Sequence, residues 1–230
     1  ILQAGLNPTA VEFVERSVVE LGERFTGISY PCPQAAAYIL LTFDGHRNDI
    51  EDRVERVREL VLAHGALDFI PLGDPARAAE IWSVRGCLGK AVEAISEQEP
   101  VDIVVPIDKI ADFVSYVHEV ERETGIRMVA FGHAGDGNVH LCVMRGERSD
   151  EEWSTELASC MKRIYGEAFR LGGLTSGEHG IGYKREALLE KYTDPVELKM
   201  MKAVKKALDP KNIMNPGKVV SINDEVPVEE

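Results

Sequence analysis

Residues 131–140 of the chain read Phe131-Gly132-His133-Ala134-Gly135-Asp136-Gly137-Asn138-Val139-His140. An Asp-Gly pair between two apolar runs is a strong signal for a β-hairpin with a two-residue turn. With Asp136 and Gly137 at the turn, counting outward along the strands places His133 opposite His140. Opposed residues of an antiparallel pair share a face, with Cβ atoms roughly 5 Å apart. Two imidazoles at that separation can bind one metal ion, although two histidines on a hairpin can also be plain surface residues.

A second glycine-rich stretch favours the metal site over the surface interpretation. It reads Thr175-Ser176-Gly177-Glu178-His179-Gly180-Ile181-Gly182 and combines three glycines with two ionisable side chains, which makes it poor core material. Glu178 would complete a His-His-Glu ligand set with His133 and His140 and leave a coordination position open for water or substrate. Because adjacent side chains on a loop tend to diverge, we interpret His179 as a separate general base.

The composition is that of an ordinary globular protein of 230 residues, of which 44% are hydrophobic. The formal net charge of −13 argues against nucleic acid as a partner, because phosphates would be repelled. The apolar runs are too short for a transmembrane segment, and no signal-peptide pattern opens the chain. Four widely separated cysteines without a Cys-x-x-Cys pair indicate a reduced, cytoplasmic protein. The first residue is Ile1 rather than Met, so we expect the chain to be part of a longer protein.

Hydrophobic periodicity and turn signals predict the secondary structure. Helices are expected over residues 8–23, 48–64, 75–97, 108–124, 150–171, 184–192 and 195–208, and strands over 36–43, 67–72, 102–106, 127–133 and 138–144. The repeated strand–helix–strand pattern predicts an α+β fold, an antiparallel sheet with helices on one face. We expect one domain over residues 1–220, followed by an acidic tail over residues 221–230 that frays.

Several further residues have both a functional and a structural interpretation. The guanidinium of Arg85 could make two parallel hydrogen bonds to the carboxylate of an acid substrate, but a solvated helix arginine is the alternative. Lys184 and Arg185 have the same two interpretations. Cys142 is interpreted as a small hydrophobe on a strand. The remaining histidines lack clustered partners and are interpreted as surface residues: His46, His64 and His118.

Three motifs in this order resemble the FAD-linked oxidases of the vanillyl-alcohol oxidase superfamily. They are the two stretches above and Leu208-Asp209-Pro210-Lys211-Asn212-Ile213-Met214-Asn215-Pro216-Gly217-Lys218. The chain is similar to the C-terminal half of the branch that contains the glycolate oxidase large subunit, D-lactate dehydrogenase and D-2-hydroxyglutarate dehydrogenase. The resemblance runs from Asn7 to Lys218. It implies an antiparallel sheet flanked by helices, a ferredoxin-like cap, with FAD held mainly by a separate N-terminal domain that is absent here.

The resemblance also implies roles for individual residues. His133, His140 and Glu178 would bind a divalent metal, usually zinc and alternatively iron or manganese. His179 would act as the general base, and Arg85 would bind the substrate carboxylate. The implied partners are the FAD-binding domain and, as electron acceptor, an electron-transfer flavoprotein or an iron–sulfur subunit.

The resemblance further narrows the substrate. The D-2-hydroxyglutarate branch would have asparagine where this chain has Cys142, a substrate-binding lysine near Pro100 and a threonine near Gly89. These residues are absent, so the resemblance does not extend to the contacts of that branch with a second carboxylate. We expect a small monocarboxylic 2-hydroxy acid such as lactate or glycolate.

The expected chemistry is oxidation of a 2-hydroxy acid, in which the hydroxyl proton is removed while the α-hydrogen leaves as hydride. A divalent metal lowers the pKa of the hydroxyl, and a neutral histidine can accept its proton near neutral pH. A cofactor must accept the hydride, because no side chain can do so. Two other classes stay open: a metal hydrolase with a zinc-activated water, and a non-catalytic module that has lost its flavin partner.

Overall fold

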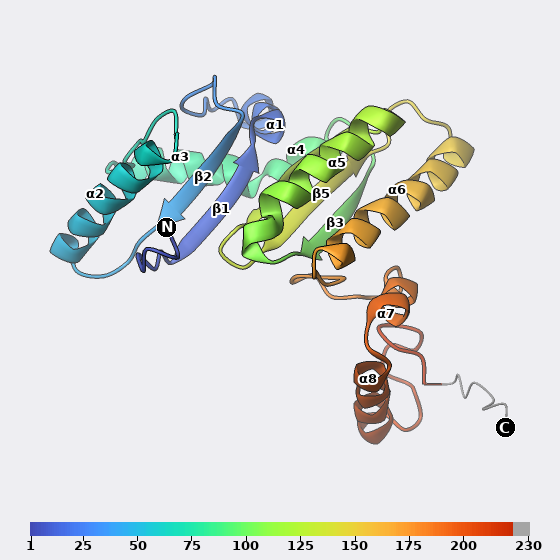
Figure 1. Cartoon of the computed structure of the whole chain (residues 1–230). Coiled ribbons are helices and arrows are strands. Elements are labelled where there is room, and N and C mark those ends of the chain that lie inside the picture. Colours follow the sequence, from blue (N-terminus) through green and yellow to red (C-terminus); the bar gives the residue numbers. More distant parts are fainter. Residues whose placement is uncertain (223–230) are drawn as a thin grey trace.

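The computed structural model describes residues 1–222, which form a five-stranded antiparallel sheet in the order β2-β1-β4-β5-β3 (Figure 1). The strands are β1 (Ala10–Glu15), β2 (Ala37–Thr42), β3 (Gln98–Val104), β4 (Met128–His133) and β5 (Asn138–Met144). The prediction of an α+β fold with an antiparallel sheet is confirmed. Of the predicted acidic tail, residues 223–230 lie outside the described part of the chain.

Most of the helices were predicted from the sequence. They are α1 (Arg16–Thr26), α2 (Arg47–Ala63), α3 (Pro75–Gly86), α4 (Leu88–Glu93), the 3₁₀ turn η1 (Ile107–Lys109), α5 (Ile110–Thr124), α6 (Asp150–Arg170), α7 (Glu186–Tyr192) and α8 (Pro195–Leu208). Within residues 1–222, none of them combines the length and the hydropathy that crossing a bilayer requires. Helices α7 and α8 extend beyond one end of the sheet (Figure 1).

Helices pack on both faces of the sheet, so the prediction that they lie on one face is wrong. Helices α5 and α6 cover one face, where Phe113 and Ile164 pack with strand residues such as Leu141. Helices α1, α3 and α4 cover part of the other face, where Val18 and Leu88 belong to a second core. The central strands β4 and β5 are therefore buried on both faces, and His133 is their one residue that is not fully buried.

The helix predicted over residues 8–23 is wrong in its first half, which forms strand β1. Val11, Val14 and Val18 have helical spacing, but this spacing crosses a junction at Arg16, where α1 begins. Strand β1 is hydrogen-bonded to β2 on one side and to β4 on the other. Pairing on both sides satisfies the backbone hydrogen-bonding groups of these residues. This sheet pairing outweighs the weak helical periodicity of their apolar side chains.

Three other differences concern segment boundaries. The strand predicted over residues 67–72 is absent from the structure, since this segment has no sheet neighbour and Leu67 is exposed. The helix predicted over 75–97 is divided at Cys87 into α3 and α4. Strand β3 begins four residues earlier than predicted and contains Pro100, which is tolerated because β3 is an edge strand.

His118 on α5 is not the isolated surface residue that was predicted. Its Nε2 lies 2.5 Å from Glu15 Oε1, and its Nδ1 lies 2.9 Å from Glu121 Oε2. Burial alone lowers the pKa of His118, but the hydrogen bonds to the two carboxylates outweigh this effect and raise its pKa above the usual 6.5. The ring of His118 therefore links β1 to α5.

We expect this contact to make the free energy of unfolding depend on pH. Because the folded-state pKa is raised, the stabilisation is fully present below a pH of about 6.5 and is lost as the pH rises through the folded pKa. The side chain of His118 is 39% exposed, so the contribution should be at most about 1 kcal/mol. Urea unfolding of the wild type and His118→Gln at several pH values should show a difference that shrinks with rising pH. The exposed control His46→Gln should show no such trend, and a pH-independent difference for His118→Gln would contradict the prediction.

Candidate functional site

The β4–β5 hairpin has a different register from the predicted one. His133 pairs with Asn138, and Phe131 pairs with His140. The pairing of His133 with His140 is thus wrong by two residues, and residues 134–137 form the connection. Because side chains alternate between faces with a period of two, a shift of two residues leaves both histidines on the same face. Their ring centroids lie 5.2 Å apart.

The longer connection results from hydrogen bonds to neighbouring strands. The Gly135 N–H donates to the carbonyl of Val11 (3.1 Å), and the Gly137 carbonyl accepts from the N–H of Val105 (3.0 Å). Gly137 has φ +77°, and a Cβ at this position would lie 2.1 Å from the carbonyl oxygen of Val105. The connection is therefore held by β1 and by Val105 just after β3, in addition to a turn hydrogen bond of its own from the Asp136 N–H to the His133 carbonyl (3.1 Å).

The three predicted metal ligands come together on this face. Glu178 Oε1 lies 3.3 Å from His133 Nε2 and 3.3 Å from His140 Nε2. One donor atom from each residue lies within 4.8 Å of the other two. Two imidazoles and a carboxylate suit zinc, iron or manganese, so the donor set fits the implied divalent metal. Burial lowers the pKa of His140 although the nearby Asp102 opposes this effect, which favours the neutral ring that a ligand requires.

Two buried carboxylates that the sequence did not single out contact the other nitrogens of the histidines. Glu12 Oε1 lies 2.8 Å from His133 Nδ1, and Asp102 Oδ1 lies 3.6 Å from His140 Nδ1. Each carboxylate is the direct cross-strand neighbour of its histidine. Carboxylates placed behind ligating histidines fix the ring orientation and increase the basicity of the ligand. The sequence contained one signal for the role of Asp102: it is an acidic residue in an otherwise apolar stretch.

Arg85 is not a solvated helix arginine. Its Nε and Nη2 donate to Glu12 Oε2 at 3.0 and 2.6 Å, and its guanidinium lies 5.1 Å from the ring centroid of Phe131. The side chain is 12% exposed. In this structure Arg85 therefore binds a carboxylate of the protein itself, that of Glu12. Nη1 is the guanidinium nitrogen that takes no part in this ion pair.

His179 lies near the same cluster. Its ring centroid is 5.4 Å from that of His140, and its Nε2 is 3.8 Å from Glu178 Oε1. The adjacent side chains of the loop therefore do not diverge as far as expected. Asp102, His140 and His179 form a second possible donor set that shares His140 with the first. The first set is the better candidate, because Glu178 Oε1 lies 3.3 Å from a nitrogen of both of its histidines, whereas Asp102 Oδ1 lies 3.6 Å from His140 Nδ1.

Asp102 connects strand β3 to the glycine-rich loop. Its Oδ2 accepts from Ser176 Oγ (2.7 Å) and from the amides of Gly177 (2.9 Å), Glu178 (3.0 Å) and His179 (2.9 Å). Burial raises the pKa of Asp102, but the hydrogen bonds outweigh this effect and hold its pKa at about 2. The carboxylate is therefore ionised at neutral pH.

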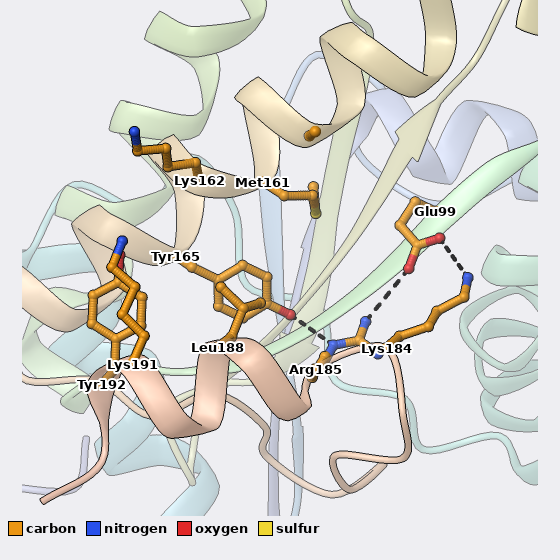
Figure 2. Close-up of a pocket in the computed structure, with 10 residues that line it drawn as sticks. Glu99, Met161, Lys162, Tyr165, Lys184, Arg185, Leu188, Lys191 and Tyr192 are labelled. Carbon is orange, nitrogen blue, oxygen red and sulfur yellow. Dashed lines mark hydrogen bonds and ion pairs between the residues drawn. The ribbon is translucent and has the colours of Figure 1, made fainter. Parts of the chain in front are cut away.

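Lys184 and Arg185 attach the far end of the loop. Arg185 donates to Tyr165 Oη (2.7 Å) and to the Pro100 carbonyl, and Lys184 lies 2.8 Å from Glu99 Oε2. Figure 2 shows the contacts of Arg185 with Tyr165 and of Lys184 with Glu99 at the edge of a pocket of about 230 Å³ between α6 and α7. The solvated interpretation is thus wrong for Arg185, which is 15% exposed, whereas Lys184 is 53% exposed.

Cys142 behaves as the predicted small hydrophobe. It is buried, and burial raises the pKa of its thiol to about 12, which makes the thiol unreactive. All four cysteines are free.

Comparisons with known proteins agree on the family. The model of the family described as FAD linked oxidases, C-terminal domain, matches residues 1–219. A D-lactate dehydrogenase of Anaerostipes hadrus is 39% identical over 93% of this chain and 46% of its own length. The glycolate oxidase subunit GlcD of Bacillus subtilis is 30% identical over 95% of this chain and 46% of its own length. The chain thus spans about half the length of the curated relatives it matches.

Solved structures agree on the fold. A 4-ethylphenol oxidase from Gulosibacter chungangensis superposes with a TM-score of 0.67 at 17% identity, over 92% of this chain and 47% of that one. A p-cresol methylhydroxylase superposes with a TM-score of 0.63 at 14% identity, over 94% of this chain and 47% of that one. At such identities the likeness concerns the fold alone. The family match, in contrast, extends over residues 1–219, and the chain therefore belongs to the FAD-linked oxidases as their C-terminal domain.

Proposed function

We propose that the chain is the substrate- and metal-binding part of a flavin-dependent 2-hydroxy acid dehydrogenase or oxidase of the D-lactate or glycolate type. The observation that carries the proposal is the position of Glu178 Oε1, 3.3 Å from the Nε2 atoms of both His133 and His140. The names of the relatives, D-lactate dehydrogenase and glycolate oxidase subunit, support the substrate class. Membership of an FAD-linked family favours this function over the metal hydrolase that the sequence left open.

The roles of the residues follow from their chemistry. A divalent ion held by His133, His140 and Glu178 would act as a Lewis acid on the substrate hydroxyl, and FAD on the partner domain would accept the hydride. The imidazole of His179, which is 66% exposed beside the cluster, takes the hydroxyl proton. Arg85 contributes a fixed positive charge for the substrate carboxylate.

The residues at or near the positions that contact a second carboxylate in the D-2-hydroxyglutarate branch favour a monocarboxylic substrate. Pro100, Cys142 and Gly89 provide no charged or polar side chain for a second carboxylate, and Cys142 is buried. Glu12 accepts two hydrogen bonds from the guanidinium of Arg85 and keeps it in place. The substrate carboxylate would therefore meet an arginine whose orientation is set before binding, which lowers the entropic cost of binding.

The first prediction concerns the metal. The purified chain should bind close to one zinc ion, because two imidazoles and a carboxylate converge without rearrangement of the backbone. The double variant His133→Ala/His140→Ala should bind none, as measured by elemental analysis after reconstitution and dialysis. A matched double variant of exposed histidines, His46→Ala/His64→Ala, should retain the zinc. A wild-type chain that takes up no divalent metal after reconstitution would rule out the site.

The second prediction separates Glu178 from His179 in the complete protein that includes the FAD-binding domain. Glu178→Gln should weaken metal binding, and excess metal should restore part of the turnover. His179→Ala should keep the metal but lose the proton acceptor, which lowers turnover by about 10²–10⁴-fold. Imidazole added as an external base should then restore activity better than added metal.

The measurements are metal content and turnover for both variants, each with and without added metal. The ligand assignment is contradicted if His179→Ala loses the metal while Glu178→Gln retains it. That outcome would transfer the metal to the second donor set of Asp102, His140 and His179.

A further inference from the structure

The glycine-rich loop follows strand β3 along its length. At one end, Leu174 forms an antiparallel bridge with Val104, and its N–H donates to the Val104 carbonyl at 2.9 Å. In the middle, residues 176–179 surround the carboxylate of Asp102. At the other end, Arg185 donates to the Pro100 carbonyl. The edge strand β3 thus serves as a support for the whole loop.

Asp102 is the central contact of this support. Three successive amide N–H groups and one hydroxyl donate to a single oxygen, Oδ2. Successive amides that point at one anion form a concave anion-binding backbone, and hydrogen bonds to an ionised oxygen are stronger than neutral ones. Two of these amides belong to Glu178 and His179, so the anion holds the backbone of both residues.

The loop also depends on a close approach to the hairpin. A Cβ on Gly177 would lie 2.5 Å from the side chain of Asn138, which is the first residue of β5. The loop backbone is therefore held between Asp102 on one strand and Asn138 on the next.

The other oxygen of Asp102 faces the metal-ligand candidate on β5. Oδ1 lies 3.6 Å from His140 Nδ1 and has no hydrogen-bond partner within residues 1–222. The Nε2 of the same imidazole lies 3.3 Å from Glu178 Oε1. One carboxylate thus contacts the backbone of Glu178 through Oδ2 and faces the ring of His140 through Oδ1.

We infer that Asp102 is a positioning residue that holds the Glu178–His179 loop against the histidine hairpin before metal or substrate binds, and that it orients the ring of His140. The inference rests on the proposed function for its reference to a metal. It adds that the geometry of the site is built into β3 and is present in the metal-free protein.

The test compares Asp102→Asn with a matched control in the full 230-residue chain. Glu15→Gln is the control, because Glu15 is also a buried strand carboxylate that accepts from a backbone amide, that of Ala130, but on the opposite face of the sheet. Zinc affinity is measured by competition with a chelator. Amide hydrogen exchange of Gly177, Glu178 and His179 is measured in the metal-free chain.

Asp102→Asn should weaken zinc binding by about 10–100-fold and accelerate exchange of the three amides. Glu15→Gln should change neither quantity, even if it lowers stability to the same extent. Should Asp102→Asn fail to fold, Ser176→Ala removes one of the four donors and should weaken zinc binding by about two- to tenfold in the same direction.

Three outcomes would overturn the inference. Zinc affinity of Asp102→Asn within about twofold of the wild type would reduce Asp102 to a structural contact. Complete loss of zinc, as expected for His133→Ala/His140→Ala, would make Asp102 a ligand. Unchanged exchange of the three amides would show that Asp102 does not hold the loop. If the wild-type chain binds no zinc, the proposed metal site fails, and the exchange measurement alone decides whether Asp102 anchors the loop.

Discussion

The antiparallel pairing of β4 with β5 at the centre of the sheet is the constraint on which the other features depend. Every residue of these strands except His133 is buried, so side chains of both faces must find partners. One face packs against α5 and α6 throughout. The other packs against α1, α3 and α4, and it also carries His133 and His140 at the hairpin end. The hairpin thus contributes to two cores and one site.

The site is built from cross-strand neighbours of the hairpin. Glu12 on β1 pairs with His133, and Asp102 on β3 pairs with His140. A carboxylate buried in an apolar sheet is costly unless it is hydrogen-bonded, and both are: Glu12 by Arg85 and Asp102 by the loop. These hydrogen bonds hold the helix that carries Arg85 beside β1, and they hold the loop that carries Glu178 beside β3.

The sequence predicted helices and strands best where the hydrophobic periodicity matches the pattern of buried residues in the structure. The amphipathic helices α5, α6 and α8 and the two hairpin strands were predicted to within a few residues. Strand β1 was missed, because its apolar residues share helical spacing with those of α1. The site residues His133, His140 and Glu178 were named from motif chemistry, and the structure brings them together. Glu12 and Asp102 were missed because their roles depend on which strands are neighbours.

By itself, the sequence determined the α+β class, the hairpin and the two glycine-rich motifs, because turn chemistry, alternation and helical periodicity are local properties of the chain. The tertiary structure alone decided the hairpin register, since hydrogen bonds with β1 and with Val105, just after β3, hold the four-residue connection in place. It also decided the partners of Arg85 and Asp102. These contacts join residues more than seventy positions apart, and no local pattern specifies which distant carboxylate will lie beside a given donor.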